Sequence, residues 1–324
     1  MHAITVSQHG GPEELRPMSV PDPEPGPGEV LVRVAASGVN FIDTYQRSGA
    51  YSMKLPYVPG SEGAGEVIAI GDEVTSVAVG QRVAWCDAPG SYAELVLVRA
   101  TRAVPVPDGV DDQVAASALL QGLTAHYLLD GSAHPQPDQT ILVHAGAGGV
   151  GLVLTQMAKA KGLRVITTVS SDAKEALSRE AGADEVLRYG DDLAERVRGL
   201  TEGRGVAVSY DGVGADTFEQ SLAATAVRGV VVLFGAASGP VPPFDLQRLN
   251  AAGSLSVTRP KLGDFIADDA EFTWRAGEVI DGIANGTVKV LVGHTYPLAE
   301  AAQAHRDLAA RTTTGSVVLL PAHG

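Results

Sequence analysis

The sequence has one cysteine, few basic residues and no long apolar segment, and each shortage excludes a class of protein. Cys86 is the only cysteine, which excludes an intramolecular disulfide framework and a multi-cysteine metal site. No run of eighteen apolar residues occurs, so we expect no membrane-spanning helix. The first fifteen residues have neither a basic nor an apolar segment, so we expect no signal peptide. These shortages together predict a cytoplasmic protein.

The shortage of basic residues bears on the partners of the protein. Lys and Arg number 24 against 38 Asp and Glu, so the formal net charge is −14 and the pI is about 4.9. An acidic surface repels phosphate backbones, so nucleic acid is not an expected partner, whereas a local basic groove can still hold an anionic cofactor. The 324 residues, 45% hydrophobic and 19% charged, are typical of a globular protein of about two domains.

The first hundred residues predict a β-rich domain. Short runs of β-branched residues alternate with glycine and proline, as in the strands of a small barrel. A proline-rich segment at 21–28 predicts a surface turn. The predicted strands are 29–38, 63–71, 81–86 and 91–98.

From residue 111 onward the pattern changes to alternating helices and strands. Residues 111–130 have apolar side chains at helical spacing and predict one helix. Five strand and helix pairs follow, which predicts a doubly wound parallel sheet and an α/β fold class. The predicted strands are 140–146, 163–169, 184–189, 207–214 and 227–235, and helices at 269–285 and 298–310 precede a last strand at 315–320.

A glycine-rich loop follows the first of these strands. Gly146, Gly148 and Gly151, with Gly149 and Val150 between them, satisfy G-x-G-x-x-G at the opening of an apolar helix. The first glycine of this motif allows a tight turn, the second a close approach of the pyrophosphate, and the third close packing of helix and strand. The loop therefore predicts a dinucleotide site, the alternative being a glycine turn in a sheet that binds no cofactor.

The end of the next strand indicates which nicotinamide dinucleotide binds. NAD sites place an acid about 20 residues after the glycines, but here Ser170 and Ser171 stand first and Asp172 is expected to cap a helix. Lys174 follows, and Tyr189 ends the third strand. Hydroxyls and an ammonium group suit a 2′-phosphate, so we expect NADPH rather than NADH. The alternative for Lys174 is an ordinary solvated charge.

Several segments together resemble the quinone oxidoreductase family, the zeta-crystallin-like branch of the zinc-free medium-chain dehydrogenase/reductases. They are GVNFIDTYQRSGAY at 38–51, LPYVPGSEGAGEV at 55–67, DQTILVHAGAGGVGLVLTQMAK at 138–159 and YDGVGADTFEQSL at 210–222. The resemblance implies a GroES-like catalytic domain at 1–122, a Rossmann NADP-binding domain at 123–261, and a return to the catalytic domain at 262–324. It also implies a homodimer or homotetramer.

The resemblance also implies that no zinc is bound. Zinc-bearing relatives have cysteine where this chain has Asn40 and histidine where it has Ser61, and neither Asn nor Ser is a good zinc ligand. Without a Lewis acid, easily reduced acceptors become the expected substrates, either quinones or double bonds conjugated to a carbonyl. Neither Tyr-x-x-x-Lys nor the G-x-S-x-G of serine hydrolases occurs.

Three residues after the first predicted strand are candidate catalytic residues, because the resemblance implies that they lie against the nicotinamide. Tyr45 is expected to donate a hydrogen bond to the acceptor oxygen, and the alternative is a packed tyrosine. Asn40 is expected to orient the carboxamide or the substrate, and the alternative is a turn residue. Asp43 is equally well explained as the cap of a helix that follows it.

Further candidates for cofactor contact come from the same resemblance. Some relatives have lysine in place of Gln121, which argues against a charge-based role there. For Thr258 and Arg259, the alternatives to cofactor contact are a subunit interface and a structural salt bridge. Cys86 is not a candidate, because it is expected to fill the core. These candidate residues are Gln121, Gly122, Thr124, Phe234, Gly235, Ser238, Thr258 and Arg259.

The resemblance predicts an NADPH-dependent quinone oxidoreductase in which the cofactor supplies the reducing equivalent. An enoyl or 2-alkenal reductase on the same fold is the nearest alternative, because acceptor choice depends on pocket shape. An alternative of another class is a cofactor-binding protein with a structural or RNA-binding role, which the acidic charge disfavours.

Overall fold

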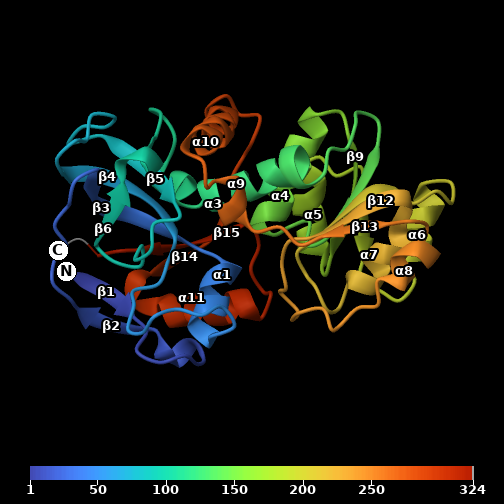
Figure 1. Cartoon of the computed structure of the whole chain (residues 1–324), viewed down its shortest axis with the longest axis horizontal. Helices are drawn as coiled ribbons and strands as arrows, with labels where there is room; N and C mark the ends of the chain where they lie inside the picture. Colours follow the sequence, from blue (N-terminus) through green and yellow to red (C-terminus); the bar gives the residue numbers. More distant parts are fainter. Residues whose placement is uncertain (323–324) are drawn as a thin grey trace. The chain divides into compact units, whose positions relative to one another are not determined.

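The computed structural model describes residues 1–322 and divides into two compact units. The barrel unit comprises Met1–Gln121, Asp268–Gly286 and the residues from Val290 onward, and the sheet unit comprises Gly122–Ala267 and Thr287–Lys289 (Figure 1). Two separated segments thus return the chain to the barrel unit. The domain limits at residues 122 and 261 that the resemblance implies stay a prediction.

The barrel unit is built on a seven-stranded sheet in the order β14-β15-β3-β4-β5-β7, with β6 also paired to β3. All pairs are antiparallel except β14 with β15. A separate hairpin joins β1 to β2. The strands are β1 His2–Thr5, β2 Arg16–Ser19, β3 Glu29–Val39, β4 Glu62–Ile70, β5 Arg82–Cys86, β6 Leu95–Arg99, β7 Val104–Pro105, β14 Val292–Pro297 and β15 Ser316–Leu320.

This unit confirms the β-rich GroES-like domain and adds strands that the sequence did not predict. The missed strand β14 (VGHTYP) alternates half-buried and exposed residues and has no apolar run. Inside the unit, Val30, Val32 and Val34 of β3 are completely buried. Cys86 is 1% exposed, and burial raises the pKa of its thiol, so its predicted place in the core is confirmed.

The predicted single helix over residues 111–130 is wrong. Helix α2 (Asp112–Ala116) ends at Ser117, whose φ of −121° and ψ of 12° are not helical. Helix α3 (Leu119–Tyr127) then begins, followed by one π-helical turn at Leu128–Ser132. The break leaves the first amides of α3 free of helical acceptors, and the chain passes from the barrel unit to the sheet unit within α3.

The remaining helices of the barrel unit lie at three places along the chain. Helix α1 follows β3 directly, and α10 and α11 come from the returning segments (Figure 1). Three short 3₁₀ turns complete the unit. The bounds are α1 Phe41–Ser48, α10 Asp269–Ala284, α11 Ala301–Ala309, and the turns Pro12–Glu14, Ala100–Arg102 and Leu298–Glu300.

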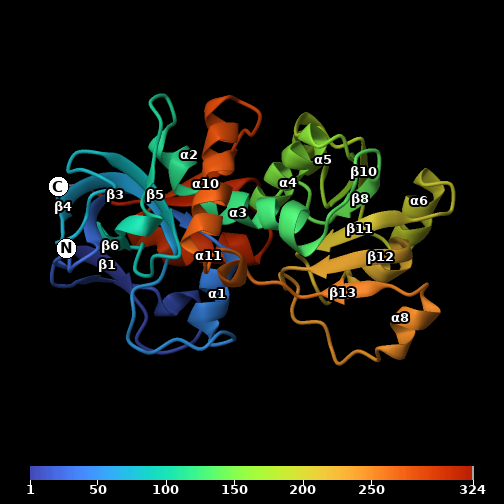
Figure 2. The same cartoon turned by 45° about the horizontal axis from the view of Figure 1, so that its top comes forward.

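The sheet unit contains six parallel strands in the order β10-β9-β8-β11-β12-β13, which confirms the Rossmann-type prediction (Figure 2). Only the short edge strand β13 was not predicted, because three residues carry no clear period. The strands are β8 Thr140–Val143, β9 Arg164–Val169, β10 Glu185–Arg188, β11 Val206–Asp211, β12 Thr225–Leu233 and β13 Ser256–Thr258. The helices are α4 Gly149–Ala160, α5 Asp172–Glu180, α6 Leu193–Leu200, α7 Phe218–Ala224, α8 Gln247–Ala251 and α9 Leu262–Phe265.

Across residues 1–322, the structure has no helix that is both long and apolar enough to span a membrane.

Candidate functional site

The glycine loop joins β8 to α4, and each glycine has a separate steric reason. A Cβ on Gly151 would lie 2.3 Å from the Ala145 carbonyl oxygen, and one on Gly146 would lie 2.5 Å from Cβ of Thr167. A Cβ on Gly148 would lie 3.3 Å from the same Ala145 oxygen, which is only a tight contact. Close packing therefore requires Gly146 and Gly151, whereas Gly148 keeps the open side of the loop free.

Gly146 lies within the turn between β8 and α4. The left-handed residue of this turn is Ala145, with φ of 54°. Its amide donates a 2.9 Å hydrogen bond to the hydroxyl of Tyr189. The approach of Thr167 from β9 adds a further reason for a glycine at position 146.

The amino end of α4 has a geometry that suits an anion. Gly148 is the N-cap in extended conformation, and the amide of Leu152 is bonded to the Gly148 carbonyl at 2.9 Å. The amides of Gly149, Val150 and Gly151 precede that bond, in the first turn, where helix geometry provides no acceptor. Together with the helix dipole they suit a phosphate group. The residues present thus fit the pyrophosphate of a dinucleotide.

The predicted 2′-phosphate residues lie at the carboxyl ends of β9 and β10. Ser170 and Ser171 are exposed, and the Ser171 hydroxyl accepts a 3.3 Å bond from the amide of Lys174. Ser171 is therefore the cap of α5, and the prediction that Asp172 caps it is wrong. The ring of Tyr189 is 38% exposed and stacks on His144 with the two planes 11° apart.

A buried polar network below the loop was missed by sequence reasoning. The Ser221 hydroxyl donates to Oδ2 of Asp211 at 2.7 Å, so its oxygen accepts from Nε2 of His144 at 3.0 Å. Nδ1 of His144 then accepts from the Thr168 hydroxyl at 3.0 Å. Burial lowers the pKa of His144, against the attraction of Asp211. The neutral ring fixes the base of the glycine loop.

The residues after β12 contact the loop that follows β11. The amides of Phe234 and Gly235 both donate to the Asp211 carbonyl, at 2.9 and 3.4 Å. A Cβ on Gly235 would lie 2.4 Å from the Gly212 oxygen. The Ser238 hydroxyl donates to the Val213 carbonyl at 2.8 Å. This arrangement gives Gly235 and Ser238 a structural role in shaping the sheet edge.

Two further candidates lie at the sheet edge around β13. Thr258, the last residue of that strand, pairs with Val232 of β12. The exposed Arg259 follows, and its guanidinium donates to the Pro260 carbonyl at 3.3 Å.

In the barrel unit, Asn40 and Asp43 form the start of α1. Asn40 is the N-cap, and its amide donates to Oδ2 of Asp43 at 2.8 Å. Asp43 is the third residue of the helix, so the prediction that the helix follows Asp43 is wrong. Asp43 nevertheless takes part in capping, because its side chain accepts the hydrogen bond from the backbone amide of the N-cap residue Asn40, as in a capping box.

Glu62 links Asn40 to the start of α3. Nδ2 of Asn40 donates to Oε1 of Glu62 at 2.6 Å, and the Leu120 amide donates to Oε2 at 2.9 Å. Burial raises the pKa of Glu62 to about 8, while these two bonds lower it. The carboxyl fixes the orientation of the Asn40 side-chain amide, whose oxygen belongs to the capping box of α1. The sequence signal was an acid at the start of a buried strand, and the sequence did not single it out.

Asp43 belongs to a chain of buried polar groups. The Tyr92 hydroxyl donates to Asp43 Oδ2 at 2.9 Å and lies 3.1 Å from Nε2 of His305. Nη1 of Arg47 lies 3.2 Å from Nδ1 of the same ring. Within residues 1–322, Oδ1 of Asp43 and the Tyr57 hydroxyl are buried without a hydrogen-bond partner. Complete burial raises the pKa of Asp43 to about 7 and lowers that of His305 to about 3.

Tyr45 lies in a small aromatic cluster. Its ring centroid is 6.2 Å from that of Phe41 and 5.4 Å from that of Tyr51, the latter edge-on. Tyr45 is half-buried and Tyr51 is 44% exposed. The sequence did not single out Phe41 or Tyr51, although aromatic residues four and six positions from Tyr45 were the available signal.

Gln121, Gly122 and Thr124 lie in α3. Oε1 of Gln121 accepts from the Ser316 hydroxyl at 2.8 Å, and the side chain is 5% exposed. This bond ties the start of α3 to β15. Thr124 is 7% exposed, and Gly122 is the first residue of the sheet unit.

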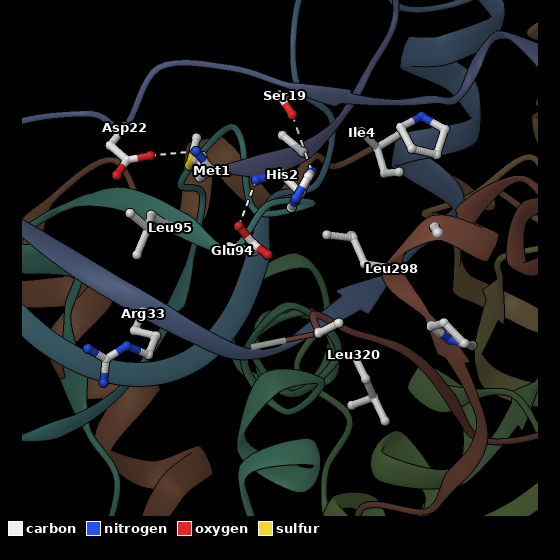
Figure 3. A pocket seen from close by; sticks show the side chains of 15 residues that line it. Met1, His2, Ile4, Ser19, Asp22, Arg33, Glu94, Leu95, Leu298 and Leu320 are labelled. Carbon is white, nitrogen blue, oxygen red and sulfur yellow. Dashed lines mark hydrogen bonds and ion pairs between the residues drawn. The ribbon is translucent and has the colours of Figure 1, made fainter. Parts of the chain in front are cut away.

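No group of three or more His, Cys, Asp or Glu side chains arranged for a metal ion occurs in residues 1–322. One cavity of about 830 Å³ opens beside β1, β2 and the segment around Leu298 (Figure 3). Several of its polar groups are paired with one another, as in the 2.7 Å bond from the His2 amide to Glu94, whereas Arg33 pairs with Glu66 outside the lining. None of the predicted site residues lines it.

The comparisons with known proteins agree with this geometry. Residues 26–108 match the alcohol dehydrogenase GroES-like domain and residues 149–274 match the zinc-binding dehydrogenase family. A GroES-like unit and a parallel sheet with a glycine-rich loop in one chain define a medium-chain dehydrogenase/reductase.

Individual relatives give a closer assignment. A quinone oxidoreductase of Pseudomonas aeruginosa is 48% identical, with 98% of this chain and 99% of the relative covered. A mycobacterial protein solved in complex with NADPH is 56% identical with a TM-score of 0.97, covering 99% of this chain and all of the other. A 2-haloacrylate reductase of a Burkholderia species is 38% identical, with 98% of each chain covered. The chain belongs to the quinone oxidoreductase family, which confirms the resemblance noted in the sequence.

Proposed function

We propose that this protein is an NADPH-dependent quinone oxidoreductase that works without zinc. The observation that supports it most directly is the glycine loop, whose helix amides and steric fit suit a dinucleotide. The NADPH complex of the 56% identical mycobacterial protein supports the choice of cofactor, and the Pseudomonas relative supports the acceptor.

In this proposal the bound cofactor supplies the reducing equivalent, and the protein orients and stabilises. The amides at the start of α4 bind the pyrophosphate. Oδ1 of Asn40 accepts a hydrogen bond from the carboxamide or substrate, because Glu62 holds the amide nitrogen. The Tyr45 hydroxyl donates to the acceptor oxygen on which negative charge develops. Asp43 keeps Asn40 in place through its bond to the Asn40 amide.

The test is NADPH oxidation followed by absorbance with a panel of quinones, a panel of 2-alkenals, and NADH as the control donor. Fast turnover of quinones with NADPH preferred supports the proposal. No turnover of quinones, despite tight NADPH binding, contradicts it.

A second candidate is an NADPH-dependent reductase of conjugated double bonds, favoured by the 38% identical 2-haloacrylate reductase. The same aromatic cluster around Tyr45 would line a pocket for either acceptor. Turnover restricted to the 2-alkenal panel selects this candidate and leaves the cofactor assignment unchanged.

We also propose that the protein acts in the cytoplasm as a homodimer or homotetramer, as the resemblance implies. Sedimentation equilibrium over a range of concentrations distinguishes these sizes from the monomer of 33.4 kDa.

A further inference from the structure

Arg188 lies beside the residues predicted to bind the 2′-phosphate, Ser171 and Tyr189, and the sequence did not single it out. It is the last residue of β10 and pairs in register with Val169 of β9. Its guanidinium donates to the Ser171 carbonyl through Nη1, and through Nη2 to Asp172 at 2.6 Å and Glu175 at 2.8 Å. One side chain therefore joins the β9–α5 loop, the first turn of α5 and the end of β10.

The two carboxylates matter because of where they stand. Asp172 follows Gly151 by about the spacing at which NAD sites hold the ribose 2′-hydroxyl with an acid. Its side chain is fully exposed. A free carboxylate at that place repels a 2′-phosphate and favours a 2′-hydroxyl. Two serines precede Asp172, but it still lies within three residues of the end of β9, where NAD sites place their acid.

Arg188 carries a charge and makes hydrogen bonds that oppose this preference. Ion pairs to Asp172 and Glu175 engage both acids. The guanidinium adds a positive charge to that of Lys174 at the same edge, and guanidinium groups recognise phosphate well. Arg179, which also pairs with Glu175 at 2.8 Å, is a cation on the same helix that does not contact Asp172 in the bonds described.

We propose that Arg188 determines cofactor choice by holding Asp172 away from the ribose and adding positive charge for the 2′-phosphate. The inference rests on the proposed preference for NADPH and names the residue responsible. The competing explanation is a surface ion-pair cluster that only joins α5 to β10. Such a cluster would affect stability slightly and would leave cofactor discrimination unchanged.

The experiment measures binding of 2′,5′-ADP and 5′-AMP by calorimetry, so it needs neither the nicotinamide nor an acceptor. Arg188→Ala is expected to weaken 2′,5′-ADP about 10- to 100-fold, because one charge-assisted contact is lost, and to leave 5′-AMP nearly unchanged. Asp172→Asn added to Arg188→Ala is expected to restore part of the lost discrimination. Arg188→Lys is expected to retain part of it through charge alone.

Arg179→Ala is the matched control, since it removes a cation from Glu175 but not from Asp172, and it is expected to keep the wild-type ratio. Wild-type discrimination that survives Arg188→Ala overturns this inference and leaves the proposed NADPH preference intact. Equal wild-type binding of the two ligands overturns that preference and the inference with it. Quinone turnover enters neither result, so a failure of the acceptor assignment stays separate.

Discussion

Two acids of the barrel unit, Asp43 and Glu62, are completely buried. Burial raises the pKa of both, to about 7 for Asp43 and about 8 for Glu62. Both carboxyl groups hold Asn40: Asp43 accepts a hydrogen bond from the Asn40 backbone amide, and Glu62 accepts one from the Asn40 side chain. Ionisation of these buried acids near neutral pH therefore lowers the free energy of unfolding, while their hydrogen bonds hold Asn40 in a fixed orientation.

The first prediction follows from the raised pKa of Asp43. The folded chain keeps this proton up to about pH 7, whereas the unfolded chain releases it near pH 4. The stabilisation is therefore complete below the unfolded pKa and is lost as pH rises through the folded one. Asp43→Asn cannot titrate, so its free energy of unfolding should gain about 2 kcal/mol relative to the wild type between pH 5.5 and pH 8. Urea unfolding at both pH values measures this.

Asp108→Asn at an exposed position is the control for that measurement and should follow the wild type. If the free energies of unfolding of the wild type and Asp43→Asn changed equally with pH, Asp43 would be ionised in the folded protein and the prediction would be wrong.

A second prediction concerns the hydroxyl of Tyr45. Tyr45→Phe keeps the ring between Phe41 and Tyr51 and removes only the donor. Turnover should fall about 10²-fold, with the dissociation constant of NADPH nearly unchanged. Steady-state kinetics together with fluorescence titration of NADPH separates the two quantities. Unaltered turnover removes Tyr45 from the mechanism.

Among the elements, the β8–α4 loop depends most directly on its residue types. Its glycines are required by different neighbours: Gly146 by Thr167 of the adjacent strand, and Gly151 by the carbonyl of Ala145. A methyl group on Gly148 would make only a tight contact, 3.3 Å from the same carbonyl. The loop therefore allows folding and binding to be tested separately.

The third prediction compares Gly151→Ala with Gly148→Ala. The former places Cβ 2.3 Å from a backbone oxygen, an overpacking expected to lower the free energy of unfolding by about 1–3 kcal/mol. Gly148→Ala should change stability much less but weaken NADPH binding, since the methyl group occupies the side that the pyrophosphate approaches. Thermal unfolding and NADPH titration of both variants measure the contrast. Equal losses of stability would contradict the steric assignment.

Helix α3 illustrates what periodicity does not reveal. The apolar spacing over 111–130 was correctly helical, but the break at Ser117 places the Leu120 amide at a helix start, where Glu62 accepts from it. A continuous helix would have used that amide in its own ladder.

For the molecule as a whole, the expected absence of zinc is the property most open to test. The positions that hold ligands in zinc-bearing relatives are Asn40 and Ser61 here, and Asn40 is already engaged with Glu62. The fourth prediction is that prolonged dialysis against EDTA leaves quinone turnover unchanged, and that added Zn²⁺ does not raise it. Metal analysis of the purified protein accompanies the assay. Turnover that falls with EDTA and returns with Zn²⁺ would contradict zinc independence.

The sequence by itself determined the parallel sheet, the β-rich unit, the position of the glycine-rich loop and the family. These features depend on local patterns, namely the alternation of strands and helices, the spacing of glycines and the order of several short motifs. The sequence did not predict β14, which has no apolar run, or β13, which has three residues. Their pairing depends on neighbours far along the chain.

Only the tertiary structure decided how the site residues are held. Glu62 meets the Leu120 amide across 58 residues, and Tyr92 meets His305 across 213. Arg188 reaches Asp172 from a neighbouring strand. Burial raises the pKa of Asp43, and hydrogen bonds between distant residues orient Asn40 and pair Asp172. A sequence pattern cannot specify them, because the partners become neighbours only when the strands pair and the helices pack.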